Sequence, residues 1–183
     1  MMSPATPRER VHTRQINLNG YRREDGLIDI EGEITDVKTY AFPNRERGMI
    51  NAGDPIHHMQ VRITINDQLE ITAAEAETVA GPYRVCPSAT LVFDRLVGLT
   101  IGPGWRQRVR KAIGGVEGCT HITELMGPVA TVAYQTLYGE IARAERAAGV
   151  KDDNKEDLGS LINTCIGHAE DAEAVLAGQL PKA

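Results

Sequence analysis

The segment from Ile28 to Val37 alternates apolar and acidic residues with a period of two. Isoleucines stand at positions 28, 30 and 34, and the carboxylates of Asp29, Glu31 and Glu33 stand between them. Successive side chains of a β-strand point to opposite faces, so this pattern predicts a strand with one apolar and one acidic face. A sheet that contains such a strand has to bury its apolar face against other elements.

A second alternation predicts an antiparallel hairpin. The outgoing strand carries Val61, Ile63 and Ile65, Asn66-Asp67 forms the turn, and Leu69 and Ile71 alternate on the return. The later sequence favours helices, at residues 73–79, 88–97, 105–113, from 120 past 141 with a kink or break at Gly127-Pro128, and at 158–176. Strands followed by helices predict an α+β fold: an antiparallel sheet of three or more strands in the N-terminal half, covered by C-terminal helices.

Length and composition predict one domain in a reducing compartment. Residues 1–20 are polar with two prolines and read as a flexible arm, which leaves 21–183 as a single α+β domain. A net charge of -5 and 4% aromatic residues argue against nucleic-acid and membrane partners. The N-terminus lacks the apolar core of a signal peptide, and three cysteines do not suit a disulfide framework. We therefore expect a cytoplasmic protein, either a monomer or a homo-oligomer.

The strongest candidate for chemistry is Cys119, which follows three glycines at the start of the longest predicted helix. Unpaired backbone N–H groups and the positive end of the helix dipole favour a thiolate at such a position. His121 and Glu124 follow within one turn. The alternative is a small, inert cysteine buried where the helix packs closely.

Other reactive side chains stand at junctions between predicted elements. His57 or His58 precedes the hairpin, Cys86 precedes a helix, and Asp36 lies near the end of the first strand as a candidate general base. Imidazole and thiolate both bind zinc and iron, but no pair has C-x-x-C spacing, so a metal site would need distant segments. Cys165 lies among apolar residues and is expected in the core.

A basic cluster occupies the predicted helix at 105–113. It consists of Arg106, Arg108, Arg110 and Lys111. Such a cluster is usually a solvated helix face. Its alternative role is to bind an anionic ligand such as a coenzyme phosphate.

Three runs together resemble a bacterial family of uncharacterised proteins, the domain of unknown function twenty-eight eighty-nine. They are Gly26-Leu27-Ile28-Asp29-Ile30-Glu31-Gly32, Pro55-Ile56-His57-His58-Met59 and Gly118-Cys119-Thr120-His121-Ile122-Thr123-Glu124-Leu125. The resemblance covers nearly the whole chain, including Asn163-Thr164-Cys165. The family implies no activity.

The layout of residues 55 to 140 is also similar to that of NifU-like iron–sulfur cluster assembly scaffold proteins. His57 stands where that family has its first cysteine, Cys86 in Tyr83-Arg84-Val85-Cys86-Pro87-Ser88 matches the second, and Cys119 matches the third. The resemblance implies a scaffold-like topology in which these three side chains converge. His57, Cys86 and Cys119 would then form a His/Cys/Cys metal site.

Three functions follow as hypotheses. The first is a zinc- or iron-dependent enzyme acting on a small molecule, with His57, Cys86 and Cys119 as ligands and His121, Glu124 or Asp36 as supporting residues or general base. The second is a non-enzymatic carrier of a metal or an iron–sulfur cluster. The third is a metal-free enzyme with Cys119 as nucleophile and a histidine as base.

Overall fold

The computed structural model describes residue 3, residues 5–149, and residues 165, 166 and 169. The chain divides into two compact units, residues 1–141 and 142–183, and the fold below is that of the first unit. The helix predicted at 158–176 lies outside the described residues except at a few positions. Among these, Cys165 is exposed, whereas the sequence placed it in the core.

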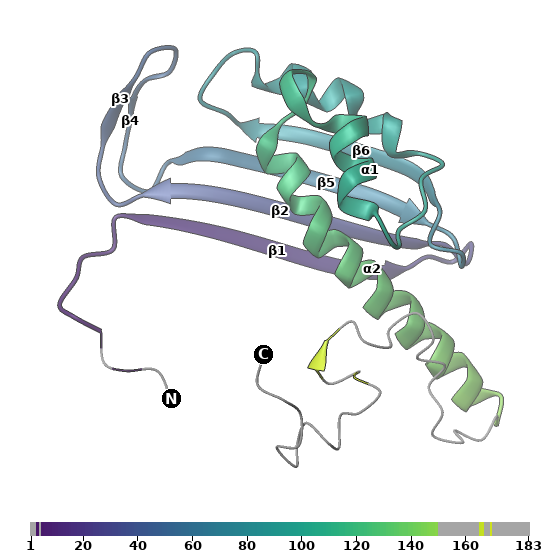
Figure 1. Ribbon diagram of the computed structural model, residues 1–183. Coiled ribbons are helices and arrows are strands. Elements are labelled where there is room, and N and C mark those ends of the chain that lie inside the picture. Colours follow the sequence, from purple (N-terminus) through teal and green to yellow (C-terminus); the bar gives the residue numbers. More distant parts are fainter. Residues whose placement is uncertain (1–2, 4, 150–164, 167–168, 170–183) are drawn as a thin grey trace. The chain divides into compact units, whose positions relative to one another are not determined.

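A four-stranded antiparallel sheet forms the base of the fold (Figure 1). Its strands, in spatial order, are β1 (His12–Arg22), β2 (Ile28–Lys38), β5 (Pro55–Ile65) and β6 (Ile71–Ala80). The short strands β3 (Phe42–Asn44) and β4 (Gly48–Ile50) pair with each other in a separate hairpin. The predicted α+β class and antiparallel sheet are confirmed.

Two segments differ from the sequence-based expectation. Residues 12–20, expected within a flexible arm, form most of β1, and residues 73–79, expected as a helix, lie in β6. The alanines and glutamates of β6 favour a helix locally, but pairing with β5 overrides this weak preference. β1 lies at the edge of the sheet, and most of its side chains are exposed. It therefore carries little of the apolar alternation by which a strand is recognised.

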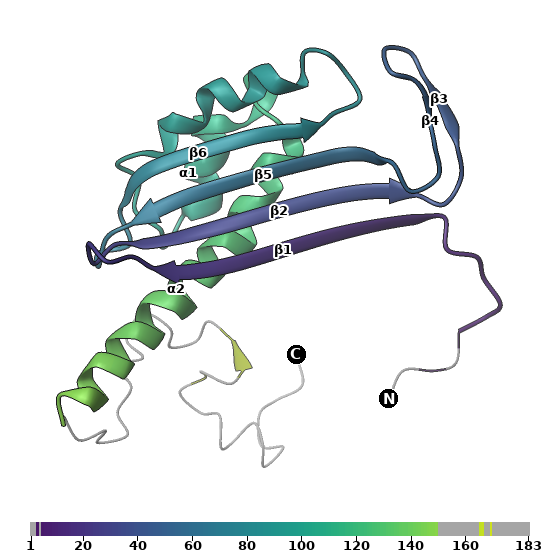
Figure 2. The same ribbon diagram turned by 180° about the vertical axis from the view of Figure 1, so that it is seen from behind.

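Helical segments cover one face of the sheet, and among the described residues no helix covers the other face, which is called the bare face below (Figures 1 and 2). They are the 3-10 helix η1 (Cys86–Leu96), α1 (Trp105–Ile113), the short turn η2 (Gly115–Glu117) and α2 (Thr120–Ala147). α2 is assigned as one helix with Pro128 inside it, so Gly127-Pro128 does not divide the helix in two. The core between the layers includes Ile30, Ile34, Ile63, Phe93, Leu96, Ile122, Leu125 and Val129.

Two glycines let α2 approach the strands closely. A Cβ built on Gly20 of β1 would lie 2.0 Å from Thr136 Oγ1, and one on Gly32 of β2 would lie 3.2 Å from Val129 Cγ2. A side chain at Gly20 would therefore displace the helix. Arg22 at the end of β1 forms an ion pair with Glu140 further along α2 (3.0 Å). The part of α2 from Val129 to Glu140 thus lies against β1 and β2 on the core side of the sheet.

Candidate functional site

Asp36 continues the apolar face of β2, because it follows Ile28, Ile30 and Ile34 at even spacing. Its side chain is only 1% exposed. The register places it opposite Arg14 of β1 and His57 of β5, so all three residues share the core face at one end of the sheet. A carboxylate at an otherwise apolar position needs polar partners, and these two neighbouring strands supply them.

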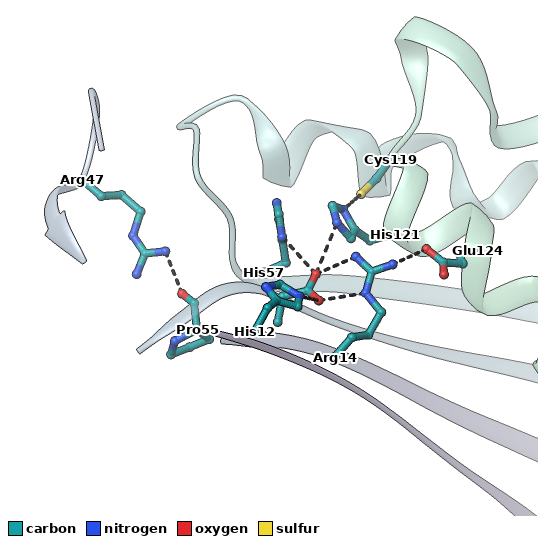
Figure 3. Close-up of polar contacts among 9 residues, drawn as sticks. His12, Arg14, Arg47, Pro55, His57, Cys119, His121 and Glu124 are labelled. Carbon is teal, nitrogen blue, oxygen red and sulfur yellow. Dashed lines mark hydrogen bonds and ion pairs between the residues drawn. The ribbon is translucent and has the colours of Figure 1, made fainter. Parts of the chain in front are cut away.

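Four side chains surround the Asp36 carboxylate (Figure 3). Arg14 donates from Nε to Oδ1 (2.8 Å) and from Nη2 to Oδ2 (2.7 Å). His12 Nε2 lies 3.1 Å from Oδ1, and His57 Nδ1 lies 3.1 Å from Oδ2. His121 Nε2 on α2 is 3.5 Å from Oδ2. Burial alone would raise the pKa of Asp36, but the hydrogen bonds from Arg14 and His12 and the charge of Arg14 outweigh it and lower the pKa to about 2.

The imidazoles of His57 and His121 stack on each other, with ring centroids 3.8 Å apart and planes inclined by 30°. Burial lowers the pKa of His57 more strongly than nearby Asp36 raises it. Burial also lowers the pKa of His121, and the charges of His57 and Arg14 act in the same direction. Both rings are therefore neutral at pH 7, the form in which imidazole binds metals.

Cys119 lies directly before the first residue of α2, and its carbonyl accepts a hydrogen bond from the N–H of Thr123 (2.9 Å). Its half-buried Sγ is 3.7 Å from His121 Nδ1. The preceding glycine has a packing role, since a Cβ on Gly118 would lie 1.7 Å from the carbonyl oxygen of Ile113. The glycine-rich run therefore joins the end of α1 to the start of α2 in a tight turn that sets the position of Cys119.

Glu124 lies one turn into α2 and extends the same network. Arg14 Nη1 donates to its Oε2 at 2.6 Å, so one guanidinium joins Asp36 and Glu124. The sequence offers both Asp36 and Glu124 as candidates for the site. In the structure both carboxylates are partners of Arg14, which the sequence places in the flexible arm.

The structure brings together only part of the expected set. Within the described residues, the group of side chains with metal-ligand atoms all within 4.8 Å of one another is Asp36, His57 and His121. Cys119 touches this group through His121 but is not a member of it. Cys86 is not a member either; its side chain packs against Gly81, where an added Cβ would lie 2.7 Å from Cys86 Cβ. The His57/Cys86/Cys119 arrangement therefore does not form here as one group.

The structure also decides between the two neighbouring histidines. His58 faces the opposite side of the sheet and lies 2.6 Å from Glu33 Oε1. The acidic face of β2, with Glu31 and Glu33, is likewise on the bare side of the sheet, where Arg62 and Gln60 contact it. Of these two neighbouring histidines, only His57 therefore contacts Asp36.

Sequence reasoning missed His12 and Arg14. A search for charge partners would not have found them, because 22 residues separate Arg14 from Asp36. The usable signal is the even spacing of His12, Arg14, Ile16 and Leu18, which places four side chains on one face of a strand. Recognising it requires knowing that the segment pairs with β2.

Comparison with known families identifies the chain. It matches the family DUF2889, described as a protein of unknown function, over residues 12–135. The chain therefore belongs to this family. The matched region runs from the start of β1 into α2 and includes Asp36 and the four side chains around it, His12, Arg14, His57 and His121. Neither the curated proteins nor the solved structures contain a significant match. The similarity to NifU-like scaffolds thus stays a prediction.

Within the described residues, no helix is both long enough and apolar enough to cross a bilayer.

Proposed function

We propose that Asp36, His57 and His121 bind a divalent metal ion, Zn²⁺ or Fe²⁺, and that the site acts on a small-molecule substrate. The observation that carries this proposal is the convergence of one carboxylate oxygen and two imidazole nitrogens within 4.8 Å of one another. Two imidazoles and one carboxylate are the ligands of many catalytic zinc sites and of mononuclear iron oxygenases. In both, water or substrate takes the remaining coordination positions.

The spacing of the ligand atoms supports the proposal. Ligands at about 2.0–2.1 Å from a tetrahedral zinc lie roughly 3.3–3.4 Å from one another. Asp36 Oδ2 lies 3.1 Å from His57 Nδ1 and 3.5 Å from His121 Nε2, on either side of that value. Small side-chain movements therefore suffice to place an ion among the three atoms.

Protonation and orientation support it as well. Asp36 is ionised and both imidazoles are neutral at pH 7, so no ligand has to lose a charge-bearing proton before an ion binds. Arg14 holds the carboxylate through two hydrogen bonds, and Cys119 Sγ faces the other ring nitrogen of His121. Contacts of this kind commonly hold metal ligands in place and select the histidine tautomer.

A bound ion would supply Lewis-acid chemistry, by polarising a carbonyl or activating a water molecule. The chain itself supplies an accessible base beside the ligands. His12 is 44% exposed and lies 3.1 Å from Asp36 Oδ1, whereas His57 and His121 lie nearest to Oδ2. His12 is therefore the candidate for moving a proton to or from a substrate.

The proposal is tested by titrating the chelator-treated protein with Zn²⁺, and with Fe²⁺ without oxygen, in a calorimeter. We expect one ion per chain, and an affinity at least tenfold lower in His57→Ala and His121→Ala. His58→Ala is the matched control, because His58 is the adjacent residue and faces the other side of the sheet. Absence of stoichiometric binding, or equal affinity in His57→Ala and His58→Ala, would contradict the proposal.

Cobalt substitution tests the ligand set itself. Co²⁺ bound by two imidazoles and a carboxylate shows no thiolate-to-metal charge-transfer band in the near ultraviolet. Co²⁺ bound by His57, Cys86 and Cys119 shows one. A charge-transfer band that disappears in Cys119→Ser would therefore show that Cys119 is a metal ligand and would contradict the proposed set of Asp36, His57 and His121.

A second candidate function is favoured by one line of contacts. The thiol of Cys119, the imidazole of His121 and the carboxylate of Asp36 follow one another at 3.7 Å and 3.5 Å. This order of nucleophile, base and orienting acid is that of thiol hydrolases and transferases. Under this hypothesis His121→Asn lowers the rate of Cys119 alkylation by iodoacetamide at least tenfold, with or without chelator. Under the metal proposal the chelator-treated protein shows no such dependence.

A further inference from the structure

A groove runs between α1 and the first half of α2, and none of Asp36, His57 and His121 lines it. Its volume is about 630 Å³, which is within the range of small-molecule sites. Its walls come from the two helices and from the loop that joins them. The lining residues are Trp105, Arg106, Val109, Arg110, Gly114, Gly115, Thr120, Thr123, Glu124, Met126, Gly127, Pro128 and Thr131.

Two arginines give the groove its charge. Arg106 and Arg110 are four residues apart on α1, so their side chains leave the same face of the helix. Within the described residues, no hydrogen bond or ion pair engages either guanidinium. Arg108 on the same helix differs, because it donates to the carbonyls of Pro103 and Thr100. Two guanidinium groups without partners beside a cavity attract an anion.

The one carboxylate that lines the groove does not neutralise these arginines. Glu124 accepts a hydrogen bond from Arg14 Nη1 at 2.6 Å, and this ion pair belongs to the Asp36 network. The loop and the start of α2 add polar groups to the lining. Gly115 contributes exposed backbone and Thr120 a hydroxyl, whereas the N–H groups of Gly114 and Thr123 already donate to the carbonyls of Arg110 and Cys119.

Part of the lining is apolar. Trp105 Nε1 donates to the carbonyl oxygen of Met126 at 2.7 Å, which fixes the indole against α2. Val109 and Pro128 add to this apolar part. A ligand that fills the groove therefore needs both an anionic group and an apolar body.

We propose that this groove binds a small amphipathic anion. Arg106 and Arg110 hold its carboxylate or phosphate group, and its apolar body packs against Trp105, Val109 and Pro128. This proposal corresponds to the alternative role of the basic helix at 105–113, the binding of an anionic ligand. It is independent of the metal proposal, since none of the three proposed metal ligands lines the groove.

The test uses Trp105 as the reporter, because it is the only tryptophan in the chain. Its fluorescence is followed while the full-length, chelator-treated protein is titrated with phenyl phosphate, benzoate, inorganic phosphate or benzyl alcohol. We expect saturable binding of phenyl phosphate or benzoate. Inorganic phosphate should bind at least tenfold more weakly, and benzyl alcohol should not saturate. No saturation with either aromatic anion, or equal binding of benzyl alcohol, would overturn the proposal.

Substitution of the arginines tests the charge. The double variant Arg106→Gln/Arg110→Gln should bind the better anion at least about tenfold more weakly, since it removes the charge-assisted hydrogen bonds to the anionic group. Lys111→Gln is the matched control. It removes one positive charge from the same helix at an exposed position that does not line the groove, and its affinity should stay within about twofold. Equal affinity in the double variant and the control would reject the role of the arginines.

Discussion

At the scale of single residues, the feature that organises the site is a carboxylate in an apolar row. Asp36 occupies the position on β2 where the alternation of Ile28, Ile30 and Ile34 would place another isoleucine. Its burial is tolerated because Arg14 forms two charge-assisted hydrogen bonds to it. Removal of Arg14 would leave the buried carboxylate without its charged partner, whereas removal of Asp36 would leave Arg14 with Glu124 alone.

Asp36→Asn is therefore expected to destabilise the metal-free protein by about 2 kcal/mol, because the neutral amide loses the charge-assisted hydrogen bonds from Arg14, which keeps only the more exposed Glu124 as counter-charge. The free energy of unfolding from urea titration measures this. The matched control is Glu31→Gln, which removes a carboxylate from the other face of the same strand, where its ion pair with Arg62 is 3.9 Å long, has both side chains 47% exposed and contributes at most about 1 kcal/mol. Equal losses in the two variants would show that Arg14 does not stabilise the buried carboxylate of Asp36 in solution.

The two stacked histidines predict a pH dependence of stability. Burial lowers the pKa of His57 and His121 below 6.5, so beneath that pH the unfolded chain binds more protons at these residues than the folded chain. Their contribution to stability is fully present above pH 6.5 and is lost as the pH falls through their folded pKa values. The metal-free protein should lose stability as the pH falls below about 6.5.

Urea titrations at several pH values measure this loss. His121→Asn should reduce the slope of unfolding free energy against pH over the same range, because one of the two groups is gone. An unchanged slope in this variant would mean that His121 is not buried in its neutral form.

At the scale of elements, the position of α2 depends on glycines in the strands beneath it. Gly20 and Gly32 allow the helix to lie against β1 and β2, and this contact brings His121 and Glu124 over the residues of the site. The strand pattern of the sequence predicts the sheet. It does not predict that the first turn of the helix meets the end of β2 that carries Asp36.

Gly20→Ala should destabilise the fold by about 1–3 kcal/mol, because its new methyl group would overlap the side chain of Thr136. Gly139→Ala on α2 is the opposite control. No atom lies within 4 Å of a Cβ built there, so alanine should stabilise the helix by up to about 1 kcal/mol. Thermal or urea unfolding measures the stability of both variants. An unchanged stability in Gly20→Ala would contradict the close packing of α2 on β1.

At the scale of the whole first unit, β1 is an integral edge strand of the sheet. It pairs with β2 along eleven residues without a register shift and supplies His12 and Arg14 to the site. Residues 5–9 before it are exposed. The boundary of the folded unit therefore lies close to residue 10, where the carbonyl of Arg10 accepts a hydrogen bond from Thr39 Oγ1.

Two truncations test this boundary. Deletion of residues 1–9 should change the free energy of unfolding by less than about 0.5 kcal/mol, because the described residues that it removes, 3 and 5–9, have exposed side chains. Deletion of residues 1–22 should abolish cooperative unfolding or metal binding, since it removes β1, exposes the edge of β2 and leaves Asp36 without Arg14. Thermal unfolding followed by circular dichroism and the calorimetric titration measure both effects. A stable, metal-binding protein after the longer deletion would show that β1 is dispensable.

The sequence by itself determined the α+β class, the strand at 28–37, the hairpin after it and the start of the long helix at Thr120. These depend on local periodicity, turn residues and helix-start signals, which short segments carry on their own. It also singled out Asp36, His57, His121, Cys119 and Glu124 as separate candidates.

Only the tertiary structure decided which of these candidate residues contact one another. Strand register sets Arg14 and His57 beside Asp36, and the packing of α2 on two glycines brings His121 to the same carboxylate, whereas Cys86 packs against Gly81. Register and packing depend on contacts between distant segments, and no local pattern encodes them.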